Sequence, residues 1–177
     1  MLWTIDPSHA SVGFAVRHMA ISTVRGSFQR FSASGETNDG GLPASMSMEI
    51  DAASIFTNNE QRDAHLRSPD FFDAGNHPTL RFESTTIAGT RDHLTITGNL
   101  TIRGITKPVT LVGEIAPAIK DPWGNPRTSL NVRGAISRSE WGLTWNQALE
   151  LGGLLVADDV KLEIEAQAVP AAAAKAA

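Results

Sequence analysis

The chain has 177 residues, of which 41% are hydrophobic and 19% charged, so it can form one folded domain with a buried core. Its net charge of −4 argues against duplex nucleic acid or an anionic membrane surface as the main partner, because both attract clusters of Lys and Arg. The absence of cysteine excludes disulfides, thiolate catalysis and cysteine-ligated metal sites.

The first segment, Met1–Pro7, lacks the basic and apolar regions of a signal peptide, so we expect it to begin the folded domain. This predicts a cytoplasmic protein. A periplasmic location would follow if a signal had been removed before this numbering begins. No segment approaches the roughly 18 apolar residues of a transmembrane helix, which predicts no stable membrane insertion.

Most of the remaining chain alternates apolar and polar residues, which is the pattern of strands with one buried face. The predicted strands are, in chain order, 12–18, 24–28, 31–35, 46–50, 80–83, 94–102, 109–115, 130–136 and 160–166. A slip in the alternation after Phe28 predicts a bulge or bend near Arg30. Parallel strands buried on both faces would be continuously apolar, so the pattern predicts an antiparallel barrel or a sandwich.

One segment, Thr57–Arg67, interrupts the strand pattern because it lacks β-branched residues after its first position. Thr57 followed by Glu60 fits a capping box, and Pro69 would end the helix. We therefore predict a short helical insert between two strands. The apolar residues that the insert would place over one end of the sheet are Leu66, Phe71 and Phe72.

The last residues, 169–177, are Ala-rich and of low complexity, and Ala-rich pieces this short are marginal helices in water. They predict a flexible tail after a domain that covers residues 1–168.

Glycines occupy the apolar faces of four predicted strands, at Gly26, Gly98, Gly113 and Gly134. They fit either the corners of a barrel with a solid core or an unfilled interior that forms a tunnel for a hydrophobic ligand. In the second case, the side chains predicted to line the tunnel are Phe14, Val16, Phe28, Met46, Met48, Phe82, Leu100, Ile102, Leu111, Leu130, Val132 and Leu162.

The five histidines show no metal-binding spacing, and we predict no metal and no cofactor. Arg62 and His65 share one face of the predicted helix, where they would either pin the helix over the barrel or recognise a polar head group. His18 faces inward at the end of its strand, as a satisfied core residue or as a polar contact in an apolar cavity.

Several sequence blocks in the same order resemble the YceI-like domain family of bacterial polyisoprenoid-binding proteins. They cover about residues 3–168 and are WTIDPSHA (3–10), VRHMAISTVRGSF (16–28), NEQRDAHLRSPDFF (59–72), GNLTIRGITKPV (98–109), SRSEWGL (137–143) and DDV (158–160).

The resemblance implies an all-β fold, a single extended antiparallel eight-stranded lipocalin-like barrel that holds a long polyisoprenoid or an isoprenoid-quinone-type lipid. It implies no catalytic residues, and the relatives suggest a homodimer. The residues that it places at the cavity are Phe14, Val16, His18, His65, Leu66, Phe71 and Phe72.

We therefore expect a non-enzymatic protein that binds, sequesters or transports a long-chain lipid. One alternative is a hydrolase or transferase that acts on a prenylated lipid with His18 or His65 as acid or base. Another alternative is a structural module with a solid core.

Overall fold

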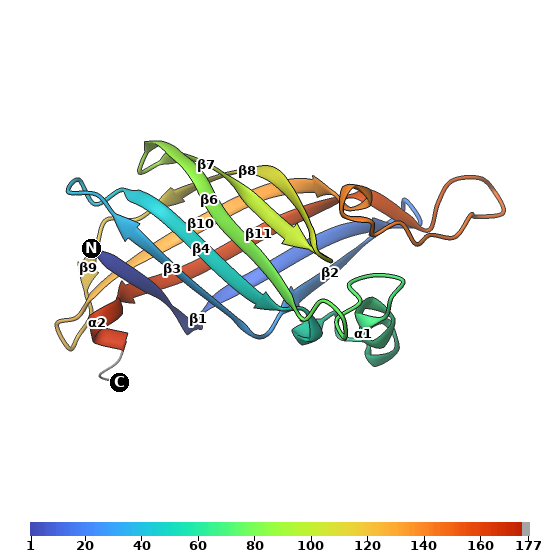
Figure 1. Cartoon of the computed structure of the whole chain (residues 1–177), viewed down its shortest axis with the longest axis horizontal. Coiled ribbons are helices and arrows are strands. Elements are labelled where there is room, and N and C mark those ends of the chain that lie inside the picture. Colours follow the sequence, from blue (N-terminus) through green and yellow to red (C-terminus); the bar gives the residue numbers. More distant parts are fainter. Residues whose placement is uncertain (175–177) are drawn as a thin grey trace.

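The computed structural model describes residues 1–174, and most of them lie in antiparallel strands (Figure 1). The strands are β1 (Leu2–His18), β2 (Ser22–Phe28), β3 (Phe31–Thr37), β4 (Pro43–Asp51), β5 (Ile55–Phe56), β6 (Thr79–Thr90), β7 (His93–Ile102), β8 (Ile105–Ile115), β9 (Ile119–Lys120), β10 (Pro126–Ser137) and β11 (Val156–Pro170). The helical elements are η1 (Ala52–Ser54), α1 (Glu60–Arg67), η2 (Arg138–Trp141) and α2 (Ala171–Ala174).

The sheet closes on itself because β1 pairs with β11 on one side and with β2 and β3 on the other. Around the barrel the order is β11-β10-β8-β7-β6-β4-β3-β1. The result is a closed eight-stranded antiparallel barrel, which confirms the predicted barrel over the sandwich. Closure removes the unpaired edge strands that an open sheet would expose.

Strands β2 and β3 together form one long, bent strand of this barrel. β2 pairs with residues 12–18 of β1, whereas β3 pairs with residues 2–4. The two halves are separated at Gln29 and Arg30, which confirms the predicted bend. The pairing of β1 with β11 also shifts register between Ile5 and Ala10, so β1 bends together with its neighbours.

The helical insert is present, but it begins two residues later than predicted, at Glu60. Asn59 is the N-cap, and its side chain accepts a hydrogen bond from the Arg62 N–H at 2.9 Å. The predicted capping box with Thr57 as N-cap is therefore wrong. Asn is at least as good an N-cap as Thr, and Asn59 has the extended backbone that an N-cap needs.

Thr57 instead lies buried under the helix. Its N–H and its hydroxyl donate hydrogen bonds to Oδ1 of Asp63, at 2.9 and 2.6 Å. Asp63 is also buried, so this contact fixes α1 against the chain that precedes it.

Two of the inward-facing glycines leave room for aromatic rings. A Cβ at Gly26 would lie 2.4 Å from Cζ of Phe14, and a Cβ at Gly98 would lie 2.4 Å from Cζ of Phe82. These glycines therefore allow rings to lie flat against the barrel wall, and they do not themselves create empty space. The interior is unfilled for a different reason, because the aliphatic side chains of opposite walls do not meet across the barrel.

The chain after residue 168 continues the barrel before it turns into α2. Val169 and Pro170 of β11 pair with Thr4 and Trp3 of β1. The rest of the predicted tail, residues 175–177, lies outside the described residues. Across residues 1–174, no helix has the length and apolar character needed to cross a membrane.

Candidate functional site

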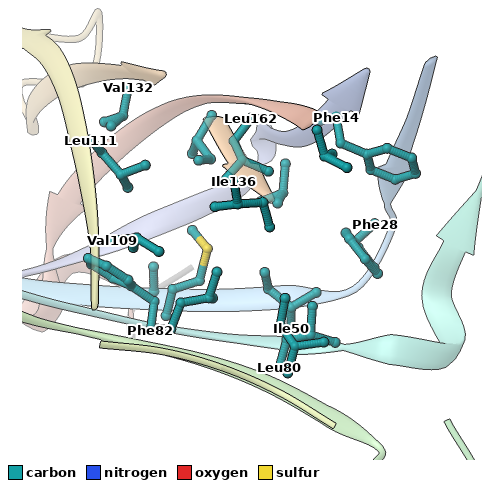
Figure 2. A pocket seen from close by; sticks show the side chains of 18 of the residues that line it. Phe14, Phe28, Ile50, Leu80, Phe82, Val109, Leu111, Val132, Ile136 and Leu162 are labelled. Carbon is teal, nitrogen blue, oxygen red and sulfur yellow. The ribbon is translucent and has the colours of Figure 1, made fainter. Parts of the chain in front are cut away.

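The barrel encloses a cavity of about 750 Å³ that extends from one end to the other. At the end that carries α1, the cavity is bordered by His65 and Trp145, and at the opposite end it is bordered by Trp3 and Thr37. Between these ends, aliphatic, aromatic and methionine side chains project from facing strands toward the interior (Figure 2). Such a wall suits an apolar chain and offers few partners to water.

Every residue predicted from the sequence to contact a ligand borders this cavity. They are Phe14, Val16, His18, Phe28, Met46, Met48, Arg62, His65, Leu66, Phe71, Phe72, Phe82, Leu100, Ile102, Leu111, Leu130, Val132 and Leu162. That they contact a ligand stays a prediction, but a solid core is excluded.

Other residues that line the cavity were missed from the sequence. Ile50, Val109 and Ile136 have the same parity as neighbouring lining residues, so the alternation already carried their signal (Figure 2). Trp145 comes from the irregular segment after η2, and no periodicity could have placed its ring at the cavity.

Aromatic side chains connect the cavity wall to the helical insert. The ring of Phe28 contacts Phe14 at a centroid distance of 5.8 Å and Phe72 at 5.7 Å, the latter edge to face. Because Phe72 follows α1 while Phe14 and Phe28 lie on β1 and β2, this row of rings ties the insert to the barrel.

His65 is held on three sides at the α1 end of the cavity. Its Nε2 lies 2.8 Å from Oδ2 of Asp70. Its ring packs edge to face against Phe71 at 5.0 Å and against Trp145 at 4.7 Å. These contacts orient the imidazole and leave it partly exposed at the cavity border.

Arg62 makes the pinning contacts that one interpretation of the sequence predicts. Its Nε donates to Oγ1 of Thr57 at 2.8 Å, and its Nη2 donates to the Thr57 carbonyl at 2.9 Å. Arg62 also borders the cavity, so pinning the helix does not remove the residue from the site.

The segment that follows η2 covers the same end and is fixed by the buried Arg138. Its guanidinium donates to the carbonyl oxygens of Leu143, Trp145 and Ala157. Burial lowers the pKa of Arg138, and the charge of nearby Asp158 opposes this effect. Arg138 lies in the block 137–143 that resembles the YceI-like domain family, but nothing in the spacing of this block showed that one side chain would bind several loop carbonyls.

The turn between β7 and β8 also contributes to the segments that cover the α1 end of the barrel. Arg103, which has a positive φ of 51°, donates from Nη1 to the carbonyls of Pro69 and Phe71. The indole N–H of Trp141 donates to the Leu100 carbonyl at 3.0 Å and is fully buried. The insert, η2 and the β7–β8 turn are thus joined through side chains.

Within residues 1–174, no three His, Asp or Glu side chains come close enough together to hold a metal ion. The polar side chains at the α1 end, His18, Arg62 and His65, can donate or accept hydrogen bonds beside the apolar cavity.

Comparison with known proteins agrees with this geometry. The model of the YceI-like domain matches residues 3–168. The chain belongs to the YceI-like domain family. A UPF0312 protein of Staphylococcus aureus strain N315 is 37% identical over 168 residues, which cover 93% of this chain and 95% of that protein.

Several solved structures have the same barrel fold as this chain. The YceI protein of Campylobacter jejuni is 30% identical, with a TM-score of 0.75 over 85% of this chain and 87% of that one. BcnA of Burkholderia cenocepacia has a TM-score of 0.79 at 24% identity, covering 92% and 98% of the two chains. A polyisoprenoid binding domain from Saccharophagus degradans has a TM-score of 0.68 at 12% identity, covering 95% and 98%. At such low identities, the last two show the fold alone.

Proposed function

We propose that this protein binds a polyisoprenoid or another long-chain lipid in the barrel cavity, and that it sequesters or carries the lipid without transforming it. The observation that carries the proposal is the apolar cavity of about 750 Å³ along the barrel. Burial of apolar surface contributes about 25 cal/mol per Å², so a long chain binds tightly with few polar contacts.

Membership of the YceI-like family supports a binding role, and a polyisoprenoid binding domain of Saccharophagus degradans that shares the fold favours this ligand class. An isoprenoid quinone would also fit this cavity, with its isoprenoid chain against the apolar wall and its ring near polar side chains at one end. The His and Arg side chains that border the cavity, among them His18, Arg62 and His65, lie at the α1 end, whereas hydroxyl groups and Glu36 border the opposite end. Because Arg and His can donate hydrogen bonds to a polar or anionic group, we place the head group at the α1 end.

Mass spectrometry of an organic extract of the natively purified protein tests the ligand class. A stoichiometric isoprenoid or quinone is the expected result. An ordinary fatty acid would retain the cavity as a lipid site but contradict isoprenoid specificity. An empty extract together with no uptake of added lipid would overturn the proposal.

A pair of neighbouring substitutions separates binding in the cavity from binding elsewhere. Leu162 points into the cavity, while Lys161 on the same strand is exposed. Leu162→Trp should weaken uptake of a fluorescent long-chain lipid about tenfold, because the indole occupies ligand space. Lys161→Trp is the matched control and should leave uptake unchanged; equal loss in both variants would contradict a site inside the barrel.

A second candidate function is catalysis, in which His65 or His18 acts as acid or base on a prenylated lipid. The contact with Asp70, which orients the imidazole of His65, is the observation that favours it. In that case His65→Ala would abolish turnover of a prenylated substrate while retaining lipid uptake. The carrier proposal expects no turnover by the unmodified protein. The cytoplasmic location and the homodimer stay predictions, which fractionation and light scattering can check.

A further inference from the structure

Two adjoining loops at the α1 end expose apolar side chains beside the cavity. The β1–β2 turn exposes Ile21, which is 77% accessible, and the loop between η2 and β11 exposes Leu154, which is 58% accessible, and Leu151, which is fully accessible. The two loops meet where the Met19 N–H donates to the Leu155 carbonyl at 2.8 Å. Leu155 borders the cavity and follows Leu154 in the chain, so the base of the longer loop adjoins the cavity.

The tips of these loops carry few charged residues. Residues 18–24 contain no Asp, Glu, Lys or Arg, and residues 141–157 contain one charged residue, Glu150. Arg17, beside the β1–β2 turn, donates from Nη2 to the Ala20 carbonyl at 2.8 Å. A surface that binds anionic partners would need clustered Lys or Arg. An apolar and nearly uncharged surface is suited instead to a hydrocarbon environment.

Part of the backbone of the longer loop is paired within the loop. Ala148 forms a bridge with Leu154, the Leu149 N–H donates to the Gly153 carbonyl, and the Gly152 N–H donates to the Leu149 carbonyl. Because these groups are paired within the loop, moving its tip from water into lipid leaves fewer of them unsatisfied.

Hydrogen bonds fix the base of this loop, whereas its tip projects outward. Asn146 accepts from the Val156 N–H and donates to the Val156 carbonyl, while Arg138 binds the Trp145 carbonyl. Beyond these contacts the loop extends away from the barrel (Figure 1). A narrow projecting tip does not offer the area of about 800 Å² that each partner of a standard protein–protein complex buries.

We propose that these two loop tips, at Ile21, Leu151 and Leu154, dock the mouth of the barrel onto the surface of a lipid bilayer. The inference rests on the proposed lipid binding, because a ligand of this class is dissolved in bilayers and must pass between bilayer and cavity. Docking inserts apolar tips without anchoring the protein, and it does not require anionic lipids.

The opposite end of the barrel provides a matched control. Trp123 and Ile119, beside the β9–β10 turn, are 81% and 68% exposed, so they are as accessible as the tip residues. The triple variant Ile21→Ser/Leu151→Ser/Leu154→Ser can therefore be compared with Ile119→Ser/Trp123→Ser. All five side chains are exposed, so both variants should keep the melting temperature of the unmodified protein.

Flotation with phosphatidylcholine vesicles measures docking, and uptake of a water-soluble, short-chain fluorescent lipid measures the cavity independently. We expect the unmodified protein to float with vesicles at any salt concentration. The tip variant should partition about tenfold less and take lipid from vesicles more slowly, because exposed apolar groups no longer leave water. The control variant should behave like the unmodified protein.

Intact uptake of the short-chain lipid without flotation would overturn the docking proposal while retaining the proposed function. Loss of flotation in the control variant, or flotation that needs phosphatidylglycerol or disappears at high salt, would also overturn it. A tip variant that changes the oligomeric state without changing flotation would assign the loops to a second copy of the chain. Absence of uptake in every variant would instead contradict the proposed function.

Discussion

The α1 end and the opposite end of the barrel are held together by different interactions. The buried polar side chains, Ser54, Thr57, Asp63 and Arg138, lie at or near the α1 end, where the covering segments are irregular. At the opposite end, strands pair almost to their tips, and a more exposed group supports the turns. There Arg127 contacts Asp6 at 2.8 Å and Asp121 at 3.1 Å.

This difference follows from the hydrogen-bonding needs of the backbone. A strand in a closed barrel obtains its partners from its neighbours, whereas an irregular segment over an apolar cavity must obtain them from side chains. A few buried polar side chains therefore supply the hydrogen bonds that hold the irregular segments at the α1 end in place. At the opposite end, Asp6 and Asp121 accept hydrogen bonds from backbone N–H groups only in the irregular part of β1 and in the turn after β9, and the other strands there are paired with their neighbours.

The largest expected effect comes from Arg138→Ala at the α1 end. The substitution would leave the buried carbonyl of Leu143 and the partly buried carbonyl of Trp145 without their donor, and we expect a loss of about 3 kcal/mol in the free energy of unfolding. Urea denaturation measures this loss. Arg133→Ala on the exposed face of β10 is the control and should cost less than about 0.5 kcal/mol. Similar losses in both variants would contradict the difference between buried and exposed arginines.

Asp63→Ala tests the contact beneath α1. Removing the carboxylate leaves the N–H and hydroxyl of buried Thr57 unpaired, which should cost about 2 kcal/mol. Thermal unfolding measures the effect, and Glu60→Ala on the exposed first turn serves as the comparison. A loss no greater than that of Glu60→Ala would show that water replaces the carboxylate.

At the opposite end, the contribution of Asp6 should depend on pH. The hydrogen bond from Arg127, followed by that from His9, lowers the pKa of Asp6 to about 2 from 3.8. A lowered folded-state pKa stabilises the protein above the unfolded value, and the contribution disappears as pH falls from about 4 to about 2.

Arg127→Ala should therefore destabilise the protein at neutral pH, and by less than Asp63→Ala, because the Arg127–Asp6 pair is partly exposed. The difference from the unmodified protein should shrink during acid titration below about pH 4. A difference that is constant over the whole titration would show that Arg127 acts through packing and not through Asp6.

The smallest effect is expected for a surface pair away from both ends. Arg81 and Glu49 lie 2.6 Å apart, and both side chains are 55% exposed. Glu49→Gln should change the free energy of unfolding by less than about 0.5 kcal/mol in urea denaturation. A loss as large as that of Arg127→Ala would remove the distinction between solvated pairs and those that support an end of the barrel.

Much of the wall of the cavity could be predicted from the sequence. Alternation at Leu100 and Ile102, or at Leu130 and Val132, selects one face of a strand, and a closed sheet turns that face inward. The alternation also predicted the break near Arg30, because a change in its phase must bend the strand or interrupt its pairing.

The cover at the α1 end was less predictable. The start of α1 depended on a choice between Thr57 and Asn59, two residues that both favour caps, and the burial of Thr57 against Asp63 decided it. The orientation of His65 toward Asp70 and Trp145 also depends on segments far apart in the chain.

The sequence by itself determined the strands, their inward faces, the helical insert and the family, because alternation and ordered motifs are local properties of the chain. Only the tertiary structure decided that the interior is a cavity and not a solid core. The four inward glycines allowed either outcome, and rings such as Phe82 fill the space beside Gly98. Whether opposite walls meet depends on how the strands are tilted and staggered when the sheet closes, which no single strand encodes.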